Sequence, residues 1–302
     1  VTFVENQDDA DEWRAAVRPN TKLFFGETIG NPKINILDIG LVSKVAHEAG
    51  VPLIVDNTIA TPYLIRPLEH GADIVIHSAT KFLGGHGTTL GGVVVESGRF
   101  DWNTDKFPLF DEPVPSYGGL TWGGNFGEYA FLTRLRAEQL RDIGPVLSAQ
   151  SAFTLAQGVE TLPYRMQAHI DNAREVANWL AQDSRIEFVN WAGLPSHPHY
   201  ERGLKYLPKG SGSVFSFSVK GGREVGRKFI ESVDLASHVA NIGDAKTLVI
   251  HPASTTHAQL TDQQLLDAGV LPGIVRLSVG IEDVEDIIYD IDQSLTKAVE
   301  GK

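Results

Sequence analysis

Lys81 stands in an unusual place for a lysine, inside the stretch HSATKFLGGHG at residues 77–87. The apolar run DIVI at residues 73–76 precedes it and is short enough to be a buried parallel strand, and a glycine-rich turn follows. A structural lysine normally lies on an exposed helix face. The plain alternative is a solvated lysine in a surface loop, so the residues around Lys81 must decide between the two.

Asp56 is the candidate partner of Lys81, because it ends another short apolar run, LIVD at residues 53–56. Opposite charges at neighbouring strand ends can form a plain salt bridge. They also suit pyridoxal phosphate (PLP), in which a lysine amine forms an imine with the cofactor and a carboxylate keeps the pyridine nitrogen protonated, so that the ring becomes an electron sink. Ser78 and Thr80 would supply hydroxyls to its phosphate from the same turn. The pattern favours the cofactor and leaves the salt bridge open.

Strands and helices alternate between residues 22 and 95, and this alternation would place Asp56 and Lys81 at one edge of a sheet. Continuous apolar strands separated by helices indicate a parallel sheet that is covered on both faces. Ligands bind at the carboxyl ends of the strands in such sheets. The predicted strands are 22–25, 53–56, one ending near residue 77, and 92–95, and the predicted helices are 38–50 and a short one at about 64–70.

The rest of the chain predicts a second α/β unit. Residues 96–124, rich in glycine, proline and aromatic residues, predict a long surface excursion. Helical spacing resumes near Phe126 and again over 148–182, where Pro163 should kink or interrupt the helix, and we place a domain boundary near residue 148. The later pattern predicts a half-buried strand at 214–219, a helix at 222–233, strands at 247–250 and 274–279, and an amphipathic helix at 283–299.

The composition restricts the partners and the chemistry. The 302 residues carry a net charge of −12, which argues against nucleic acid or an anionic membrane as the main partner. The absence of cysteine excludes disulfides, zinc–thiolate sites and cysteine nucleophiles, and it fits a cytoplasmic location. No apolar run approaches the ~20 residues that span a bilayer. The chain starts at Val1 rather than methionine, on what resembles a strand, so we expect it to be cut from something longer.

Five stretches together resemble the signature of the Cys/Met-metabolism PLP enzymes, which include cystathionine γ-synthase, cystathionine and methionine lyases and O-acetylhomoserine sulfhydrylase. They are ETIGNP (27–32), VDNTIATPY (55–63), HSATKFLGGHG (77–87), NIGDAKTLVIHPASTTHAQL (241–260) and GIVRLSVGIED (273–283). The resemblance implies an α/β fold of the aspartate-aminotransferase type (fold type I). Residues 1–147 would be the C-terminal portion of the large PLP-binding domain, with a mostly parallel sheet. Residues 148–302 would be a long linking helix and a smaller C-terminal α/β domain.

The resemblance also implies roles at the cofactor. Lys81 would be the Schiff-base lysine and would later move protons at Cα and the neighbouring carbons of the substrate. Asp56 would pair with the pyridinium nitrogen. Asn31 would hydrogen-bond the ring hydroxyl, although an asparagine before proline is also a common turn residue. Ser78 and Thr80 would contact the phosphate, or else be small polar turn formers.

Two further residues would bind the substrate. Arg276, near the middle of an apolar strand, would clamp the substrate α-carboxylate with its planar guanidinium. Thr247 and the backbone beside it would help at the same carboxylate, although the family more often has serine there. Nothing in the spacing of the histidines requires a metal, so we expect no metal site.

Within the family, HPASTTHAQL (251–260) and VDNTIATPYL (55–64) are most similar to the O-acetylhomoserine sulfhydrylase branch. Other branches tend to carry methionine or a bulky apolar residue where Ser254 and Thr255 stand. This implies γ-replacement, in which acetate leaves Cγ and sulfide or a thiol adds to give homocysteine or methionine. Cystathionine γ-synthase or a cystathionine or methionine lyase is the alternative within the family. The resemblance further implies a homo-oligomer, a dimer of dimers, whose N-terminal phosphate loop and ring-stacking aromatic have no counterpart in this sequence.

Two alternatives from other classes stay open. The run Ser78-Ala79-Thr80-Lys81 is also an S-x-x-K motif, which carries the nucleophile of serine acylases such as β-lactamases. Those enzymes also need S-D-N and K-T-G elements, and the sequence has neither. A non-catalytic fragment that only binds partners is favoured by the missing N-terminal part and opposed by the intact Lys81, Asp56 and Arg276.

Overall fold

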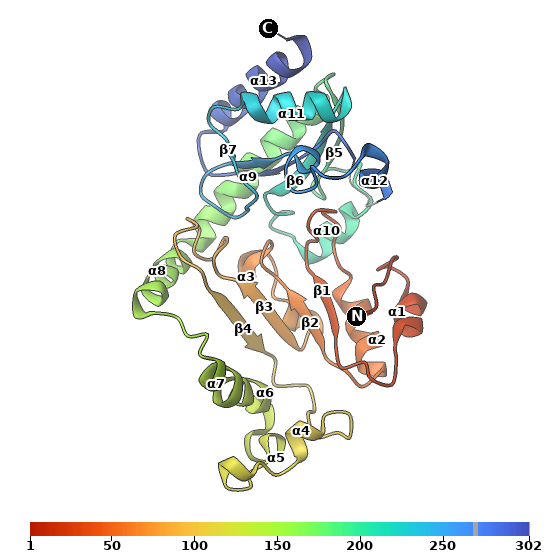
Figure 1. Ribbon diagram of the computed structural model, residues 1–302, viewed down its shortest axis with the longest axis vertical. Helices are drawn as coiled ribbons and strands as arrows, with labels where there is room; N and C mark the ends of the chain where they lie inside the picture. Colours follow the sequence, from red (N-terminus) through yellow and green to blue (C-terminus); the bar gives the residue numbers. More distant parts are fainter. Residues whose placement is uncertain (268–270, 302) are drawn as a thin grey trace.

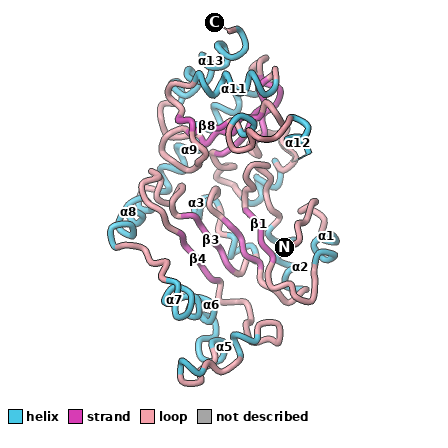
Figure 2. The backbone as a smooth tube through the Cα atoms, in the orientation of Figure 1, coloured by secondary structure: helices cyan, strands magenta, loops and turns pink. Residues whose placement is uncertain are grey.

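The strands of the first half form one sheet with the order β1-β2-β3-β4, in a computed structural model that describes residues 1–267 and 271–301 (Figure 1). These strands are β1 (Phe24–Glu27), β2 (Leu53–Asp56), β3 (Ile74–Ser78) and β4 (Gly92–Glu96). β1, β2 and β3 run parallel, so their carboxyl ends meet at one edge, as the alternating sequence predicts. Figure 2 shows this sheet and the C-terminal sheet as separate groups of strands.

The helices around this sheet begin and end at residues that the sequence marks. Helix α2 (Ile39–Glu48) begins after Asp38, whose carboxylate accepts the Leu41 N–H at 3.1 Å. It ends shortly before Gly50, whose φ of +66° favours glycine. The other helical segments up to β3 are α1 (Ala10–Ala16), α3 (Thr61–Leu64) and the 3₁₀ turn η1 (Pro67–His70).

Strand β4 departs from the expected parallel sheet. It runs antiparallel to β3, with Ser78 opposite Gly92. Residues 79–91 connect the two strands without an α-helix, whereas parallel neighbours are usually joined by a helical crossover. The side chains of residues 93–95 are 38–40% exposed, so the sheet is not covered on both faces at β4, which corrects the sequence expectation.

Residues 97–147 include most of the stretch 96–124, for which the composition predicts a surface excursion, and this stretch has buried side chains of its own. Trp102, Phe110 and Trp122 are all buried and pack with Ile74 of β3 into a small core, in which the rings of Trp102 and Phe110 stack at 4.6 Å. The segment holds α4 (Pro108–Asp111), η2 (Pro115–Tyr117), α5 (Trp122–Phe126), η3 (Gly127–Tyr129), α6 (Ala130–Arg134), the π-helical turn η4 (Leu135–Leu140) and α7 (Arg141–Ile143).

Two consecutive helices link the halves of the chain. Helix α8 (Ala149–Glu160) stops at Thr161, and α9 (Leu162–Gln182) starts directly afterwards with Pro163 in its first turn, which confirms the predicted interruption. Met166 of α9 belongs to the core of the first half, and Val176 of the same helix belongs to the core of the second half. Because α9 contributes to both cores and α8 to the first, the division near residue 148 stays a prediction.

The second sheet has the strand order β5-β6-β9-β8-β7. Its central strand pair is β6 (Val214–Val219) and β9 (Ile274–Ser278), and β6 is buried on both faces rather than half-buried as predicted. Ser218 tolerates this burial because its hydroxyl donates to a Glu187 carboxylate oxygen at 2.9 Å. The other elements are β5 (Ile186–Asn190), α10 (Tyr200–Tyr206), α11 (Gly222–Ser232), β7 (Ser237–His238), β8 (Leu248–Ile250), η5 (Pro252–Ser254), α12 (Asp262–Asp267) and α13 (Val284–Glu300).

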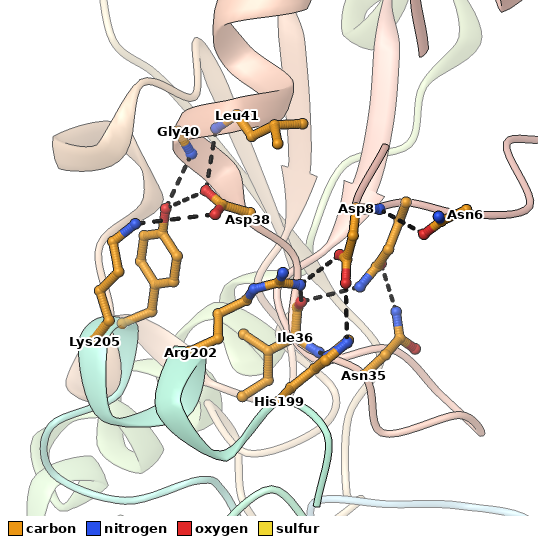
Figure 3. A network of polar contacts seen from close by, with 12 residues as sticks. Asn6, Asp8, Asn35, Ile36, Asp38, Gly40, Leu41, His199, Arg202 and Lys205 are labelled. Atoms are coloured by element: carbon orange, nitrogen blue, oxygen red, sulfur yellow. Dashed lines mark hydrogen bonds and ion pairs between the residues drawn. The ribbon is translucent and has the colours of Figure 1, made fainter. Parts of the chain in front are cut away.

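Helix α10 belongs to the second half but is docked on the N-terminal segment and on the start of α2 (Figure 3). Arg202 donates to a carboxylate oxygen of Asp8 at 2.5 Å and to the Ile36 carbonyl at 2.9 Å. The Tyr206 hydroxyl donates to Asp38 at 2.6 Å, and this bond joins α10 to the residue that caps α2. Within residues 1–267 and 271–301, no helix is both long and apolar enough to cross a membrane.

Candidate active site

The candidate site begins at the carboxyl ends of the parallel strands. Asp56 is the last residue of β2 and lies opposite Glu27 of β1 on one side and Ile76 of β3 on the other. Ser78 ends β3, and Lys81 follows three residues later. The strand geometry therefore places Asp56 and the Lys81 turn at the same edge of the sheet.

The Lys81 turn (residues 78–85) is held by its own backbone. The Lys81 N–H donates to the Ser78 carbonyl at 3.2 Å, and the Gly85 N–H donates to the Lys81 carbonyl at 2.7 Å. The Lys81 Nζ donates to the side-chain oxygen of Asn241, which arrives from the second half of the chain. Burial lowers the pKa of Lys81, and the charge of Arg276 lowers it further. A lowered pKa increases the share of neutral amine, which is the form that acts as a nucleophile or a base.

Arg276 of β9 is part-buried and joins three parts of the site. Its Nη1 donates to the Asn31 side-chain oxygen at 3.1 Å, and its Nη2 donates to the Asn241 carbonyl at 3.1 Å. Its Nε is buried and has no hydrogen-bond acceptor within the described part of the chain. Burial lowers the pKa of Arg276 from its very high ordinary value. A guanidinium with N–H groups left over in a buried place is suited to bind a carboxylate.

The groups around Asp56 affect the orientation and the charge of its carboxylate. One of its carboxylate oxygens accepts the Thr58 N–H at 2.8 Å. His77, one residue before the end of β3, is buried, and this burial lowers its pKa although the nearby Asp56 charge acts in the opposite sense. A neutral imidazole beside Asp56 leaves the carboxylate charge available for a cationic partner.

Two threonine hydroxyls, of Thr58 and Thr80, connect the Lys81 turn to its neighbours. The Ser78 N–H donates to the Thr58 hydroxyl at 2.8 Å, which connects the ends of β2 and β3. The Thr80 hydroxyl accepts the Gly91 N–H at 3.0 Å and so holds the turn to the residue just before β4. The predicted phosphate contacts of Ser78 and Thr80 stay predictions.

Thr247 has a different neighbourhood from the predicted substrate contact. It is buried, its hydroxyl donates to a Glu282 carboxylate oxygen at 2.9 Å, and the same hydroxyl accepts the Gly280 N–H at 2.9 Å. These bonds anchor the loop of residues 241–247 to the segment after β9. The structure thus brings Lys81, Asn31 and Arg276 into one connected group and leaves the Thr247 side chain outside its hydrogen bonds.

Asn241 is the site residue that the sequence did not single out. It contacts Lys81 through its side chain and Arg276 through its carbonyl. Gly243, two residues on, shows why this loop can come so close: a Cβ there would lie 2.7 Å from the Phe82 nitrogen and 2.9 Å from the Lys81 Cβ. The glycine in the stretch NIGDAK is the sequence signal that could have indicated this loop, because a backbone that approaches another segment this closely requires a glycine.

This donor set fits PLP. The cofactor and an α-amino acid require an amine with a lowered pKa, a carboxylate for the ring nitrogen, hydroxyls for the phosphate and a cation for the α-carboxylate. Lys81, Asp56, the hydroxyls of the Lys81 turn and Arg276 supply these groups, and the buried Nε–H of Arg276 has no hydrogen-bond partner among the described residues. Lys81 would hold the cofactor covalently, Asp56 would face its ring nitrogen, and Ser78 and Thr80 would face its phosphate.

Comparisons with known proteins point in the same direction. The family model described as Cys/Met metabolism PLP-dependent enzyme matches residues 1–296. An O-acetyl-L-homoserine sulfhydrylase of Leptospira meyeri is 50% identical over 98% of this chain and 69% of that protein. A homocysteine synthase of Schizosaccharomyces pombe is 48% identical over 97% of this chain and 69% of that protein.

A solved structure extends the likeness from sequence to fold. It is a putative O-acetylhomoserine (thiol)-lyase from Campylobacter jejuni, which contains N′-pyridoxyl-lysine-5′-monophosphate. The TM-score is 0.89 and the identity is 37%, over 96% of this chain and 69% of that chain. The fold class expected from the sequence, an α/β enzyme of fold type I, is thereby confirmed, and so is PLP as the cofactor.

Proposed function

The chain belongs to the Cys/Met metabolism PLP-dependent enzymes, and we propose that it replaces the acetate of O-acetylhomoserine by sulfide or a thiol. The products are homocysteine or a methionine-type thioether, and acetate. The observation that carries the proposal is the link from the Lys81 amine through Asn241 to Arg276, because it joins a proton-transfer group to a carboxylate clamp. The serine-acylase alternative is set aside, since this family uses PLP.

When bound, the cofactor supplies an electron sink for the substrate carbons. The chain supplies the rest. Arg276 binds the α-carboxylate with its free N–H groups and fixes the substrate relative to Lys81. Lys81 takes the proton from Cα and returns protons to the carbon chain, and its lowered pKa favours the neutral amine that accepts a proton. Asp56 would face the ring nitrogen of the cofactor and favour its positively charged form.

The overall exchange balances without an external oxidant or reductant. The bond between Cγ and the ester oxygen breaks, and acetate leaves with the electron pair. The sulfur of hydrosulfide or a thiolate forms the new bond to Cγ. The protons that Lys81 removes are returned to the same carbon chain, so the amine ends in the protonation state in which it started.

The experiment supplies the PLP-loaded enzyme with O-acetylhomoserine and sulfide and measures homocysteine and acetate. We expect both products in equal amounts, and none from Lys81→Ala, which keeps the turn but has no amine. O-succinylhomoserine and O-phosphohomoserine as alternative substrates identify the leaving group. Release of a 2-oxo acid and ammonia instead of homocysteine would assign the enzyme to the lyases and contradict the proposal.

We further propose that the enzyme is a cytoplasmic homo-oligomer, a dimer of dimers. Large apolar side chains are exposed in and just before the linking helices α8 and α9, where Ile143, Val146 and Tyr164 are 72–81% exposed. Such surfaces are usually covered by another subunit, and the absence of cysteine suits a reducing compartment. Light scattering of the holoenzyme should give four times the subunit mass, and a monomer at working concentration would contradict this assembly.

A further inference from the structure

Arg165 is a buried arginine that the site described so far does not use. It lies on α9, is 6% exposed, and forms no ion pair within residues 1–267 and 271–301. Its Nη1 donates to the Phe82 carbonyl at 2.8 Å, and its Nη2 donates to the Gly158 carbonyl at 2.6 Å and the Leu83 carbonyl at 3.3 Å. Its Nε donates to the Thr161 hydroxyl at 3.2 Å. A buried guanidinium normally has a carboxylate partner, so this choice of acceptors requires a reason.

The carbonyl acceptors lie where a helix or a hydrogen-bonded turn ends. Gly158 is in the last turn of α8, and Phe82 and Leu83 lie in the second half of the Lys81 turn. Carbonyls at such ends lack partners in their own segment and carry partial negative charge, which a buried cation satisfies. Two of the carbonyls that Arg165 binds belong to the residues directly after Lys81 in the chain.

Two glycines show how closely these segments are packed. A Cβ at Gly85, which has a φ of +78°, would lie 2.3 Å from the Arg165 Nη1. A Cβ at Gly158 would lie 2.5 Å from the Gly84 carbonyl oxygen and 2.6 Å from that of Leu83. The Lys81 turn therefore rests on α8 and on Arg165 with no space between them.

One helical turn further along α9, His169 supports the same segment from another side. Its ring lies edge-on to the ring of Phe82, with the centroids 5.2 Å apart. Its Nδ1 donates to the Val279 carbonyl, at the end of β9, at 2.7 Å. Helix α9 thus contacts both the Lys81 turn and the strand that carries Arg276.

We propose that Arg165 is a positioning residue for Lys81. By holding the carbonyls of Phe82 and Leu83 it fixes the backbone from which the Lys81 side chain starts, and so fixes the point from which the amine reaches the substrate carbons. Asn241 then needs only to orient the amine itself. This inference rests on the proposed function, because proton transfer between two carbons requires the amine to be held to within a fraction of an ångström.

The test compares Arg165→Met and Arg165→Lys with Arg174→Met in the PLP-loaded enzyme. Arg174 is the matched control because it lies on the same helix, is exposed, and pairs with Asp171. For Arg165→Met we expect kcat to fall about 10- to 100-fold, with KM for O-acetylhomoserine within about twofold, since Arg276 keeps its contacts. Arg165→Lys should recover part of kcat, and Arg174→Met should behave as wild type.

Two further measurements separate positioning from general stability. The pH midpoint of the visible absorbance of the bound cofactor reports the environment of Lys81, and it should shift in Arg165→Met and not in Arg174→Met. Hydrogen exchange in the cofactor-free protein should become faster in the peptide of residues 79–86, whose amides close the Lys81 turn. Both measurements also work if O-acetylhomoserine is not the substrate, so failure of the proposed function and failure of this inference are distinguishable.

Three results would overturn the inference. The first is a wild-type kcat in Arg165→Met with an unshifted absorbance midpoint, and the second is a loss that appears in KM alone. If Arg165→Met fails to fold, Gly158→Ala replaces it as the test of positioning. The added Cβ would displace the Leu83 and Gly84 carbonyls without removing a charge. A wild-type kcat and midpoint in Gly158→Ala is the third contrary result, and a lowered kcat with unchanged KM supports the inference.

Discussion

Single residues of this site combine charge with partial burial. Lys81 and Arg276 are two cations whose pKa values are both lowered, Lys81 in part by the charge of Arg276. Holding two positive groups close together costs free energy when nothing negative lies between them. A substrate carboxylate at Arg276 and a negatively charged cofactor near Lys81 would each relieve this repulsion, so the unfavourable charge pattern itself favours ligand binding.

The first prediction concerns Asp56. Asp56→Asn keeps the shape and the bond from the Thr58 N–H but cannot hold a proton on the ring nitrogen. We expect kcat to fall about 100-fold, which is the usual effect of losing one electrostatic contact at a reacting centre. The unfolding temperature should stay close to that of wild type. Glu27→Gln is the matched control, because Glu27 lies opposite Asp56 in the neighbouring strand. A larger loss in Glu27→Gln than in Asp56→Asn would move the assignment to Glu27.

The second prediction concerns Arg276. Lysine keeps the charge but loses the planar fork, so Arg276→Lys should mainly weaken substrate binding. Losing a charge-assisted contact of about 1.5–3 kcal/mol raises the apparent KM for O-acetylhomoserine roughly 10- to 100-fold. The absorbance of the bound cofactor without substrate should not change. The control is Arg223→Lys, which alters an arginine paired with Asp262 on the outside of the second half. Equal substrate titration curves for Arg276→Lys and wild type would remove Arg276 from the substrate site.

At the scale of elements, local signals predict some segments and long-range contacts decide the others. The apolar run at residues 53–56 predicts strand β2, and the cap at Asp38 and the stop near Gly50 predict helix α2. The structure has both elements close to the predicted bounds. Strand β5 (IEFVN) and helix α10 were not predicted, because their short patterns show no clear period. Ser218 suggests a solvent face, but its bond to Glu187 lets the same face be buried.

The candidate site divides in the same way. Lys81 and Asp56 are recognisable from the sequence because each follows its own strand in a short motif. Asn241 is not, because its importance comes from a contact with Lys81 across 160 positions of the chain. Arg165 is hidden for a similar reason: on a helical pattern it counts as a polar residue, and only the fold shows that it faces the carbonyls after Lys81.

The third prediction belongs to helix α9 and concerns stability against pH. Burial lowers the pKa of His169 to about 4 from an ordinary value near 6.5. Between these two pH values the unfolded chain binds a proton that the folded protein does not, so the free energy of unfolding falls as the pH falls. Without His169 the free energy of unfolding should depend less steeply on pH. The slope should decrease by up to the contribution of one proton, about 1.4 kcal/mol per pH unit.

The measurement is urea unfolding of wild type and His169→Gln at pH values from 4.5 to 7. His197, whose burial also lowers its pKa to about 4, stays in both proteins, so the slope should decrease and not vanish. His238→Gln is the control for replacing a histidine at an exposed position. An unchanged slope in His169→Gln would show that His169 takes up its proton equally in the folded and unfolded protein.

At the scale of the whole molecule, the two halves are joined through contacts on both sides of the sheet edge that carries the site. Helix α9 connects the Lys81 turn to the end of β9, and α10 is docked on the N-terminal segment and α2 (Figure 3). Lys81 and Arg276 come from different halves, so their separation depends on how firmly these helices hold. Contacts far from the site can therefore alter substrate binding without touching it.

The last prediction tests this dependence at Tyr206 of α10. Its hydroxyl donates to Asp38 at 2.6 Å and accepts the Gly40 N–H at 3.2 Å. Burial alone would raise the pKa of Asp38, but the hydrogen bonds from Tyr206 and the Leu41 N–H outweigh it and lower this pKa. The stabilisation from the carboxylate is thus present above the ordinary pKa of an aspartate and is lost as the pH falls through the lowered value.

Tyr206→Phe removes both bonds of the hydroxyl and keeps the ring. We expect the free energy of unfolding at pH 7 to fall by about 1–2 kcal/mol, as for a partly exposed hydrogen bond to a charged group, and the pKa of Asp38 to rise. KM for O-acetylhomoserine should rise more than kcat falls, because a looser α10 lets the half that carries Arg276 move relative to Lys81. Tyr289→Phe on α13, where the tyrosine is 73% exposed, is the control. A Tyr206→Phe enzyme with the expected loss of stability and an unchanged KM would show that the site keeps its geometry without this docking contact.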